Sequence, residues 1–147
     1  MIIIEFEAFS ILSHTKVNDF VNFLEKGKII GTICKKCGKK YFPSVTDCRK
    51  CLSNQFEWVE LDNKGKLETF TMISVPPSRV QDYIPPSYNF NHYLIGIIKT
   101  NEGFRVMGWI RGLKLEDIEI GMDMKCKPLI FNRRGRKRVT IELIPLK

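Results

Sequence analysis

The sequence lacks the short motifs that mark a self-sufficient enzyme. It has only two histidines, His14 and His92, and neither stands at a motif spacing from another catalytic or ligating side chain. It contains no GxSxG nucleophile elbow, no HExxH, no Walker A loop and no GxGxxG fingerprint in a βαβ setting. Its acidic residues are scattered, with no pair that can be placed on one face. These absences favour a binding module over an enzyme, although distant residues can assemble a site that no motif reveals.

An export signal and long hydrophobic runs are lacking too. The N-terminal MIIIEF is apolar, but Glu5 and Glu7 interrupt it and no basic region comes before it. The uncharged runs are shorter than the roughly 20 apolar residues that a membrane-spanning helix needs. We therefore expect a cytoplasmic protein with no membrane segment and with reduced cysteines.

Charge of one sign is concentrated in one segment. The 147 residues are 44% hydrophobic and 27% charged, which is the balance of a soluble globular protein. Residues 125–138 hold seven basic residues and no acid, so most of the net charge of +8 lies there. A patch of this kind suits an anionic partner such as a phosphate, a nucleotide-bearing cofactor or a nucleic acid.

The apolar pattern predicts one helix and then a series of strands. Val17, Phe20, Val21 and Leu24 recur at helical spacing, with Thr15 to cap the start and Gly27 to end the helix. We expect this amphipathic helix to pack on its own protein; a partner helix is the alternative. Strand periodicity and turn signals then mark five segments, at 66–75, 92–100, 104–112, 124–131 and 138–146. Five short strands, with only a short turn at 115–121 between the third and fourth, suggest a small closed or partly open barrel.

Four of the five cysteines form two CxxC pairs within "CKKCGKKYFPSVTDCRKC". Cys34 and Cys37 precede Cys48 and Cys51 by ten residues, and two such turns can close a tetrahedral four-sulfur site. Structural zinc is the favoured reading; a rubredoxin-like iron site and a redox pair are the alternatives, and a redox pair would need only one CxxC. Four protein ligands leave no open position for substrate, so we expect the metal to organise structure. Cys126 stands apart, and we expect it to be a buried small hydrophobe.

The candidate ligand-binding residues come from two segments. Residues 75–93 form a long connection with four of the seven prolines and a cluster of aromatics, and long ordered loops are often functional. The alternatives are a loop packed by its own aromatics and, for the basic hairpin, a solvated edge. His92 is a candidate, although a structural role is favoured for it. The candidates are Arg79, Tyr83, Tyr88, Phe90, His92 and Tyr93 of the loop, with Arg133 and Arg134 of the basic segment.

The order of parts resembles the DUF35 family across roughly residues 15–146. The most specific pieces are the cysteine segment with its Phe42–Pro43, "GKLETFTMI", "LIGIIKTNEGFRVMGWI" and "IEIGMDMKCKPLIF". The resemblance implies a mainly β protein, with an N-terminal helix and a rubredoxin-like zinc ribbon followed by a five-stranded OB-fold barrel. We expect an N-terminal segment at 1–30, the ribbon at 31–60 and the OB-fold at 61–147. Residues 1–14 lie outside the resemblance.

The resemblance also implies a function. Family members are similar to non-catalytic, acyl-CoA-associated partners of thiolase-superfamily enzymes, and archaeal members bridge acetoacetyl-CoA thiolase and HMG-CoA synthase. It carries over the four cysteines as metal ligands but no residues for coenzyme A. If the barrel is an OB-fold, the loop between its first two strands and the hairpin between its last two flank one face. The loop aromatics would then contact the pantetheine arm of coenzyme A or the partner enzyme. Arg79 or the basic hairpin would bind the phosphates of coenzyme A. The competing interpretation is a ribbon-plus-OB nucleic-acid-binding protein, which is weakened because the basic and aromatic residues lie in different segments.

Overall fold

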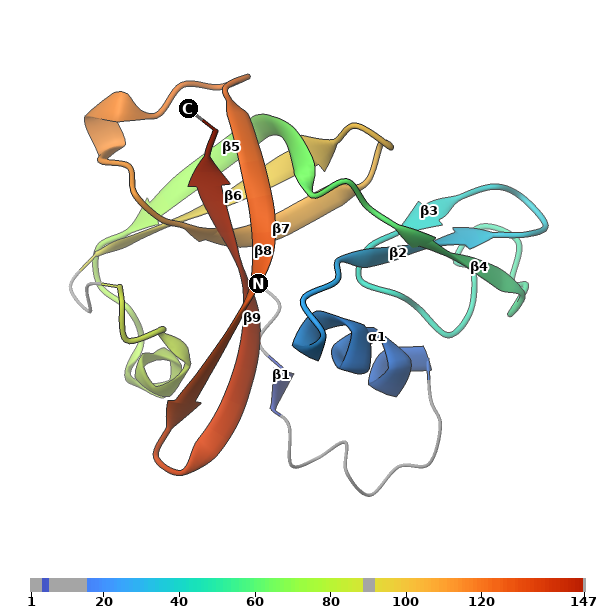
Figure 1. Ribbon diagram of the computed structural model, residues 1–147, viewed down its shortest axis with the longest axis horizontal. Coiled ribbons are helices and arrows are strands. Elements are labelled where there is room, and N and C mark those ends of the chain that lie inside the picture. Colours follow the sequence, from blue (N-terminus) through green and yellow to red (C-terminus); the bar gives the residue numbers. More distant parts are fainter. Residues whose placement is uncertain (1–3, 6–15, 89–91, 147) are drawn as a thin grey trace.

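The computed structural model describes residues 4–5, 16–88 and 92–146 (Figure 1). No helix among them is long and apolar enough to cross a membrane. These described residues contain one α-helix, two short 3₁₀ helices (η1 and η2) and nine strands. In order they are β1 (Ile4–Glu5), α1 (Lys16–Glu25), β2 (Ile30–Cys34), β3 (Lys40–Tyr41), β4 (Phe56–Glu60), β5 (Lys64–Ile73), η1 (Ser78–Tyr83), β6 (Tyr93–Thr100), β7 (Arg105–Ile110), η2 (Leu115–Asp117), β8 (Asp123–Arg133) and β9 (Arg136–Pro145).

The five predicted strands are β5 to β9, and they close into the expected OB-fold barrel. The strand order is β1-β9-β7-β6-β5-β8, and β8 pairs with β9 as well as with β5, so the sheet closes on itself. A register shift between Leu67 and Thr69 marks an irregularity in β5 that helps a strand to bend. The β8–β9 hairpin turns at Arg134 and Gly135, both with positive φ, as a tight hairpin requires.

The predicted helix and ribbon are also confirmed. Strands β3, β2 and β4 form a separate antiparallel sheet, and α1 lies between this ribbon and the β8–β9 hairpin (Figure 1). Phe20, Val21 and Leu24 of α1 are each about 1% exposed, because their spacing puts them on one face. Gly27 follows the helix with a φ of 79°, which glycine adopts without strain. The pairing of β1 with β9 at Val139 and Arg138 was not predicted.

The ribbon and the barrel share one hydrophobic core. The buried face of α1 packs with barrel residues such as Leu67, Val106 and Ile141, and ribbon residues Trp58 and Val59 pack against the same cluster. Phe104, at the start of β7, points its ring at Gly31 of β2 so closely that a Cβ there would lie 2.4 Å from a ring carbon. The ribbon is therefore fixed to the barrel by packing.

A second core lies on the outer face of the barrel. On β6 and β7, residues alternate between the barrel interior and this outer face, where Tyr93, Ile95 and Trp109 point. Ile84 and Tyr88 of the long connection cover them, and the Trp109 indole lies 4.7 Å from the Tyr93 ring and donates to Thr140 Oγ1 at 3.0 Å. Part of the long connection, with Ile84, Pro85 and Tyr88 buried, thus forms a packed cover.

Candidate functional site

The four ribbon cysteines form the metal centre that their spacing predicts. The Sγ atoms of Cys34, Cys37, Cys48 and Cys51 all lie within 4.8 Å of one another. Each CxxC turn is closed by the same hydrogen bond: the amide of Gly38 donates to the carbonyl of Cys34, and that of Leu52 to the carbonyl of Cys48, both at 2.8 Å. The two turns therefore face each other with four sulfur atoms between them.

The surroundings of two of the sulfur atoms, those of Cys34 and Cys48, favour thiolates, whereas burial and the neighbouring cysteines raise the pKa of Cys51 to about 11. The pKa of the Cys34 thiol is lowered by the backbone amide of Cys37, against the effect of burial. Burial raises the pKa of Cys48, but hydrogen bonds from the Tyr41 hydroxyl and from backbone amides outweigh it and bring this pKa to about 5. Tyr41 is itself fixed, because its hydroxyl accepts the Arg49 amide at 2.9 Å and lies 3.3 Å from Cys48 Sγ.

This donor set fits zinc. Four thiolates at mutual tetrahedral spacing, each turn braced by backbone amides, are the ligands of a closed structural site. Such a site holds no exchangeable water or substrate, so it does not act as a Lewis acid on a ligand. Tyr41 and Phe56, packed edge to face with centroids 5.9 Å apart, cover the centre from the side of the ribbon sheet.

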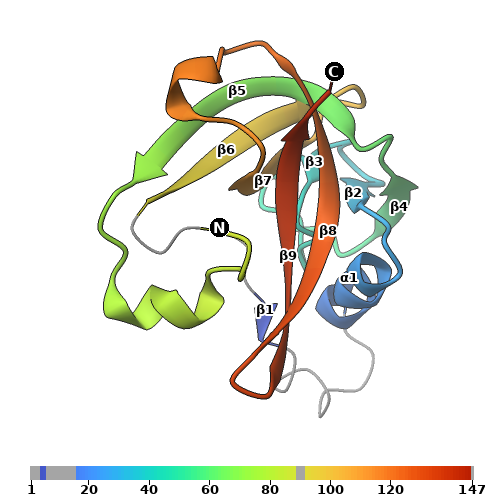
Figure 2. The same ribbon diagram turned by 60° about the vertical axis from the view of Figure 1, so that its left-hand side comes forward.

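The two segments proposed to bind an anion meet in the structure. η1 lies against the β8–β9 hairpin, on the opposite side from α1 (Figure 2). Arg133 donates to the carbonyl of Ile84 at 2.7 Å, Arg134 lies 3.1 Å from the Asp82 carboxylate, and the Arg138 guanidinium stacks 4.6 Å from the Tyr83 ring centroid. These contacts line a cavity of about 320 Å³, here called the arginine cup, formed by Asp82, Arg133, Arg134, Arg136 and Arg138.

Two of the candidate loop aromatics, Tyr88 and Tyr93, are mostly buried. Tyr88 and Tyr93 are 9% and 4% exposed and belong to the second core, so their rings mostly contact the protein itself. Their edges line, with exposed His92, a pocket of about 170 Å³. Arg79 is exposed on η1, and Phe90 lies outside the described residues. Tyr88 and Tyr93 pack against Trp109 and help to bury it, and a ligand contact of their pocket-lining edges stays a prediction.

A buried carboxylate, Glu142, was missed by the sequence reasoning. It is fully buried on β9, where it accepts hydrogen bonds from the Tyr88 hydroxyl at 3.3 Å and from Lys127 at 3.1 Å, and Arg111 lies 3.4 Å away. Burial and this carboxylate raise the pKa of Tyr88, which keeps the phenol protonated as a donor. No motif could reveal the cluster, because its members come from four separate segments. The fifth cysteine, Cys126, is fully buried as expected, and burial raises its pKa to about 12.

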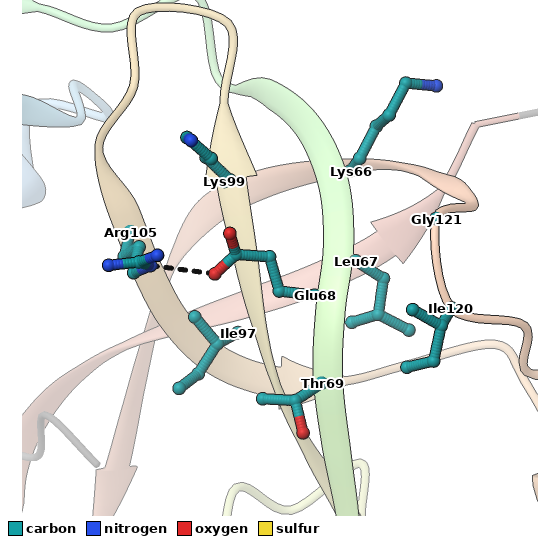
Figure 3. Close-up of a pocket in the computed structure, with 9 residues that line it drawn as sticks. All are labelled: Lys66, Leu67, Glu68, Thr69, Ile97, Lys99, Arg105, Ile120 and Gly121. Atoms are coloured by element: carbon teal, nitrogen blue, oxygen red, sulfur yellow. Dashed lines mark hydrogen bonds and ion pairs between the residues drawn. The ribbon is translucent and has the colours of Figure 1, made fainter.

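A second hollow on the barrel was also not predicted. It is an open groove of about 760 Å³ beside β5, lined by Lys66, Leu67, Glu68, Thr69, Ile97, Lys99, Arg105, Ile120 and Gly121 (Figure 3). Glu68 reaches across β6 to Arg105, whose guanidinium Nε lies 2.8 Å from its carboxylate (Figure 3). Lys66 pairs with Asp123 at 2.9 Å, so two of the three cations are already neutralised. The groove has an apolar floor with little net charge.

Comparisons with known proteins agree with this architecture. Residues 22–57 match the family described as the rubredoxin-like zinc ribbon domain of ChsH2, and residues 58–127 match the C-terminal OB-fold domain of ChsH2. Among solved structures, the Ltp2–ChsH2(DUF35) aldolase superimposes with a TM-score of 0.66 over 92% of this chain and 97% of that one, at 16% identity. A DUF35 protein of unknown function from Sulfolobus solfataricus has a TM-score of 0.58 over 91% and 87%, at 18% identity. At these identities the two structures show a shared fold.

Relatives in sequence are more informative. A DUF35 domain-containing scaffold protein of Methanocaldococcus jannaschii is 36% identical over 118 residues, which cover 80% of this chain and 77% of the relative. The benzoylsuccinyl-CoA thiolase subunit BbsA of Thauera aromatica is 30% identical over 82 residues, or 56% of this chain and 51% of that subunit. With the ribbon, the barrel and the four cysteines all in place, the chain belongs to the DUF35 family of zinc-ribbon and OB-fold proteins.

Proposed function

We propose that this chain is a non-catalytic scaffold that binds thiolase-superfamily enzymes acting on acyl-CoA, such as an acetoacetyl-CoA thiolase and an HMG-CoA synthase. The observation that carries the proposal is a metal centre with four protein ligands, in a protein whose 36%-identical relative is named a scaffold. A saturated centre has no position for substrate. A thiolase subunit among the relatives supports the class of partner.

The arginine cup is the proposed contact for the phosphates of coenzyme A. Four arginines and one aspartate line it, so it keeps a positive excess after the Arg134–Asp82 pair is counted. Guanidinium groups bind phosphates through paired, charge-assisted hydrogen bonds. Arg133 and Arg138 contact η1 and are largely covered, whereas Arg134 and Arg136 are exposed, so we expect these two to reach a ligand.

The nucleic-acid alternative receives little support. OB-folds bind single strands by stacking bases on exposed aromatic rings of the sheet face. On the described part of that face in this chain, Trp109 and Tyr93 are buried beneath Ile84 and Tyr88. Their neighbours on β6 and β7 are the aliphatic Ile97 and Met107. Phe70 of β5 lines the same hollow but is half-buried against the barrel core, so no fully exposed ring stands on the described part of this face.

Two measurements test the proposal. The zinc-loaded protein should be retained by a recombinant thiolase-superfamily enzyme from the same organism, and the chain alone should show no turnover of acyl-CoA. Failure to bind any enzyme of that class would refute the scaffold.

The proposed phosphate contact is tested by measuring the affinity of the protein for coenzyme A with the partner enzyme present. Arg134→Ala with Arg136→Ala should weaken binding about tenfold at low salt, with a smaller loss at high salt because exposed charge contacts are screened. The matched control, Lys66→Ala with Lys99→Ala, also removes two cations, but from the groove of Figure 3. If the lysine pair lowers affinity and the arginine pair does not, the phosphates lie in the groove.

A further inference from the structure

The two cysteine turns, CKKCG and CRKCL, end in the same backbone conformation but have different residues there. In the first turn the residue after the second cysteine is Gly38, with a φ of 74°; in the second turn it is Leu52, with a φ of 61°. Both amides donate to the carbonyl of the first cysteine in their turn at 2.8 Å. The conformation is therefore required at both places, and only the first turn has the residue that adopts it without strain.

A leucine at this position disfavours the turn that it completes. Side chains with a Cβ are strained in the left-handed region, and bulky apolar residues are rare there. The fold gains nothing in return, because Leu52 is 81% exposed and belongs to none of the hydrophobic clusters among the described residues. Leu52 also supplies no ligand atom to the metal. A strained, exposed leucine on a rigid turn indicates that its side chain contacts another molecule.

The charges around Leu52 indicate what kind of surface it meets. Arg49 and Lys50, in the same turn, and Lys35 and Lys36, in the facing turn, are all exposed. From residue 34 to residue 52 the ribbon has six basic residues and one acid, Asp47. Zinc with four thiolates carries two negative charges, so this end of the ribbon keeps a positive excess. Leu52 is therefore an exposed apolar side chain on a part of the ribbon whose two turns both carry exposed cations, and these four cations are called the charged ring below.

We propose that Leu52 is the apolar anchor by which the ribbon docks, and that it inserts into a pocket with a carboxylate rim on the partner enzyme. The proposal rests on the proposed function and names the part of the chain that makes the contact. A single leucine fixed on a metal-braced turn loses little freedom on binding, which is the property of an interface anchor. The surrounding lysines and arginines speed the encounter and align it with the acidic rim.

Substitutions at Leu52 distinguish a role in docking from a role in folding. If Leu52 serves docking, its replacement should weaken binding to the partner enzyme without lowering the melting temperature; if it serves folding, the melting temperature should fall. Glycine and asparagine both accept a positive φ, so Leu52→Gly and Leu52→Asn should keep one zinc per chain and an equal or higher melting temperature. Both should weaken binding to the recombinant thiolase-superfamily enzyme at least tenfold. Val75→Ala is the control, since it trims another apolar side chain, 85% exposed, far from the metal centre in sequence.

The charged ring is tested in the same titration. Arg49→Ala with Lys50→Ala should weaken binding and flatten its dependence on salt. If the wild-type chain binds the enzyme and Leu52→Gly binds it equally tightly, the anchor is refuted while the scaffold stands. If Val75→Ala weakens binding as much as Leu52→Gly does, Leu52 has no special part in docking and the inference fails. If the wild-type chain binds no enzyme of this class, the scaffold proposal and the anchor fail together.

Discussion

A methyl group added at Gly31 tests how firmly the ribbon is joined to the barrel. In Gly31→Ala the new Cβ would lie 2.4 Å from Phe104 Cε1 and 2.7 Å from Cδ1, well inside van der Waals contact. The ring has nowhere to swing, because Phe104 is 2% exposed and its amide donates to Thr100 Oγ1 at 3.1 Å. Strand β2 is held as well, since Lys40 of the neighbouring β3 donates to the carbonyl of Glu102 at 2.6 Å, across to the β6–β7 turn.

Overpacking of a well-filled core costs about 1–3 kcal/mol. For a chain of this length each kcal/mol lowers the melting temperature by roughly 2–4 °C. We therefore expect Gly31→Ala, saturated with zinc, to melt several degrees below wild type in a calorimetric or circular-dichroism scan. Its zinc content should stay at one per chain, because the clash lies in the shared core and not among the cysteines.

A second substitution shows whether the clash is the cause. Phe104→Leu shortens the side chain that the methyl group meets, so Gly31→Ala should cost less in that background. The double-mutant cycle should give a coupling of at least about 0.5 kcal/mol between the two positions. Additive effects, or a Gly31→Ala protein as stable as wild type, would show that the ribbon moves away from the barrel freely and that the close packing of β2 on Phe104 does not persist in solution.

Three further outcomes are expected. Cys48→Ser should abolish stoichiometric zinc binding, as measured by elemental analysis. It should also remove hydrogen-exchange protection from the Gly38 and Leu52 amides, while the barrel amides stay protected. Loss of the whole fold would contradict the separate small core around the cysteines. At pH 8 a thiol reagent should label no cysteine in the zinc-loaded protein, four cysteines after chelation and all five after unfolding. Cys126 should react only after unfolding, because it is buried and its pKa of about 12 keeps the thiol protonated. Fast labelling of Cys126 in the folded protein would disprove its burial. Tyr88→Phe should lower the free energy of unfolding by about 1.5–3 kcal/mol, since it removes a donor to the buried Glu142 carboxylate. The Tyr93 hydroxyl has no hydrogen bond among the described residues, so Tyr93→Phe should leave the free energy of unfolding nearly unchanged. Equal losses of stability in the two variants would show that the effect of Tyr88→Phe does not come from Glu142.

Local chemistry made much of this fold predictable. The paired CxxC spacing identifies the metal ligands because two short turns bring four sulfur atoms together whatever surrounds them. The helix and the five strands could be found from apolar period and turn residues, and their observed bounds differ from the predicted ones by only a few residues. The meeting of η1 with the β8–β9 hairpin followed from OB-fold topology, since both connections flank one face.

Other features depend on contacts that no local pattern records. Tyr88 and Tyr93 were predicted to contact a ligand because they lie in a long, aromatic-rich connection; their burial depends on which way β6 faces, which the sequence of the connection does not record. Glu142 reads as an ordinary strand residue until Lys127, Arg111 and Tyr88 are placed around it. Leu52 attracts no notice in the sequence, because only its φ of 61° and its exposure of 81% in the structure show that it is out of place.

The way this chain uses its barrel bears on how a scaffold of this kind can work. The outer face of β6 and β7, where OB-folds bind single-stranded nucleic acid, is partly filled by the chain's own Ile84 and Tyr88. The exposed groups that we propose to meet a partner enzyme or coenzyme A lie instead at two tips, the metal-braced turn with Leu52 and the hairpin with Arg134 and Arg136. The two tips can hold an enzyme and its coenzyme A in a set geometry only if the parts that bear them do not move relative to each other. The core shared through α1, together with the tight packing of β2 on Phe104, supplies that rigidity, so loosening this joint should impair assembly even where both tips are intact.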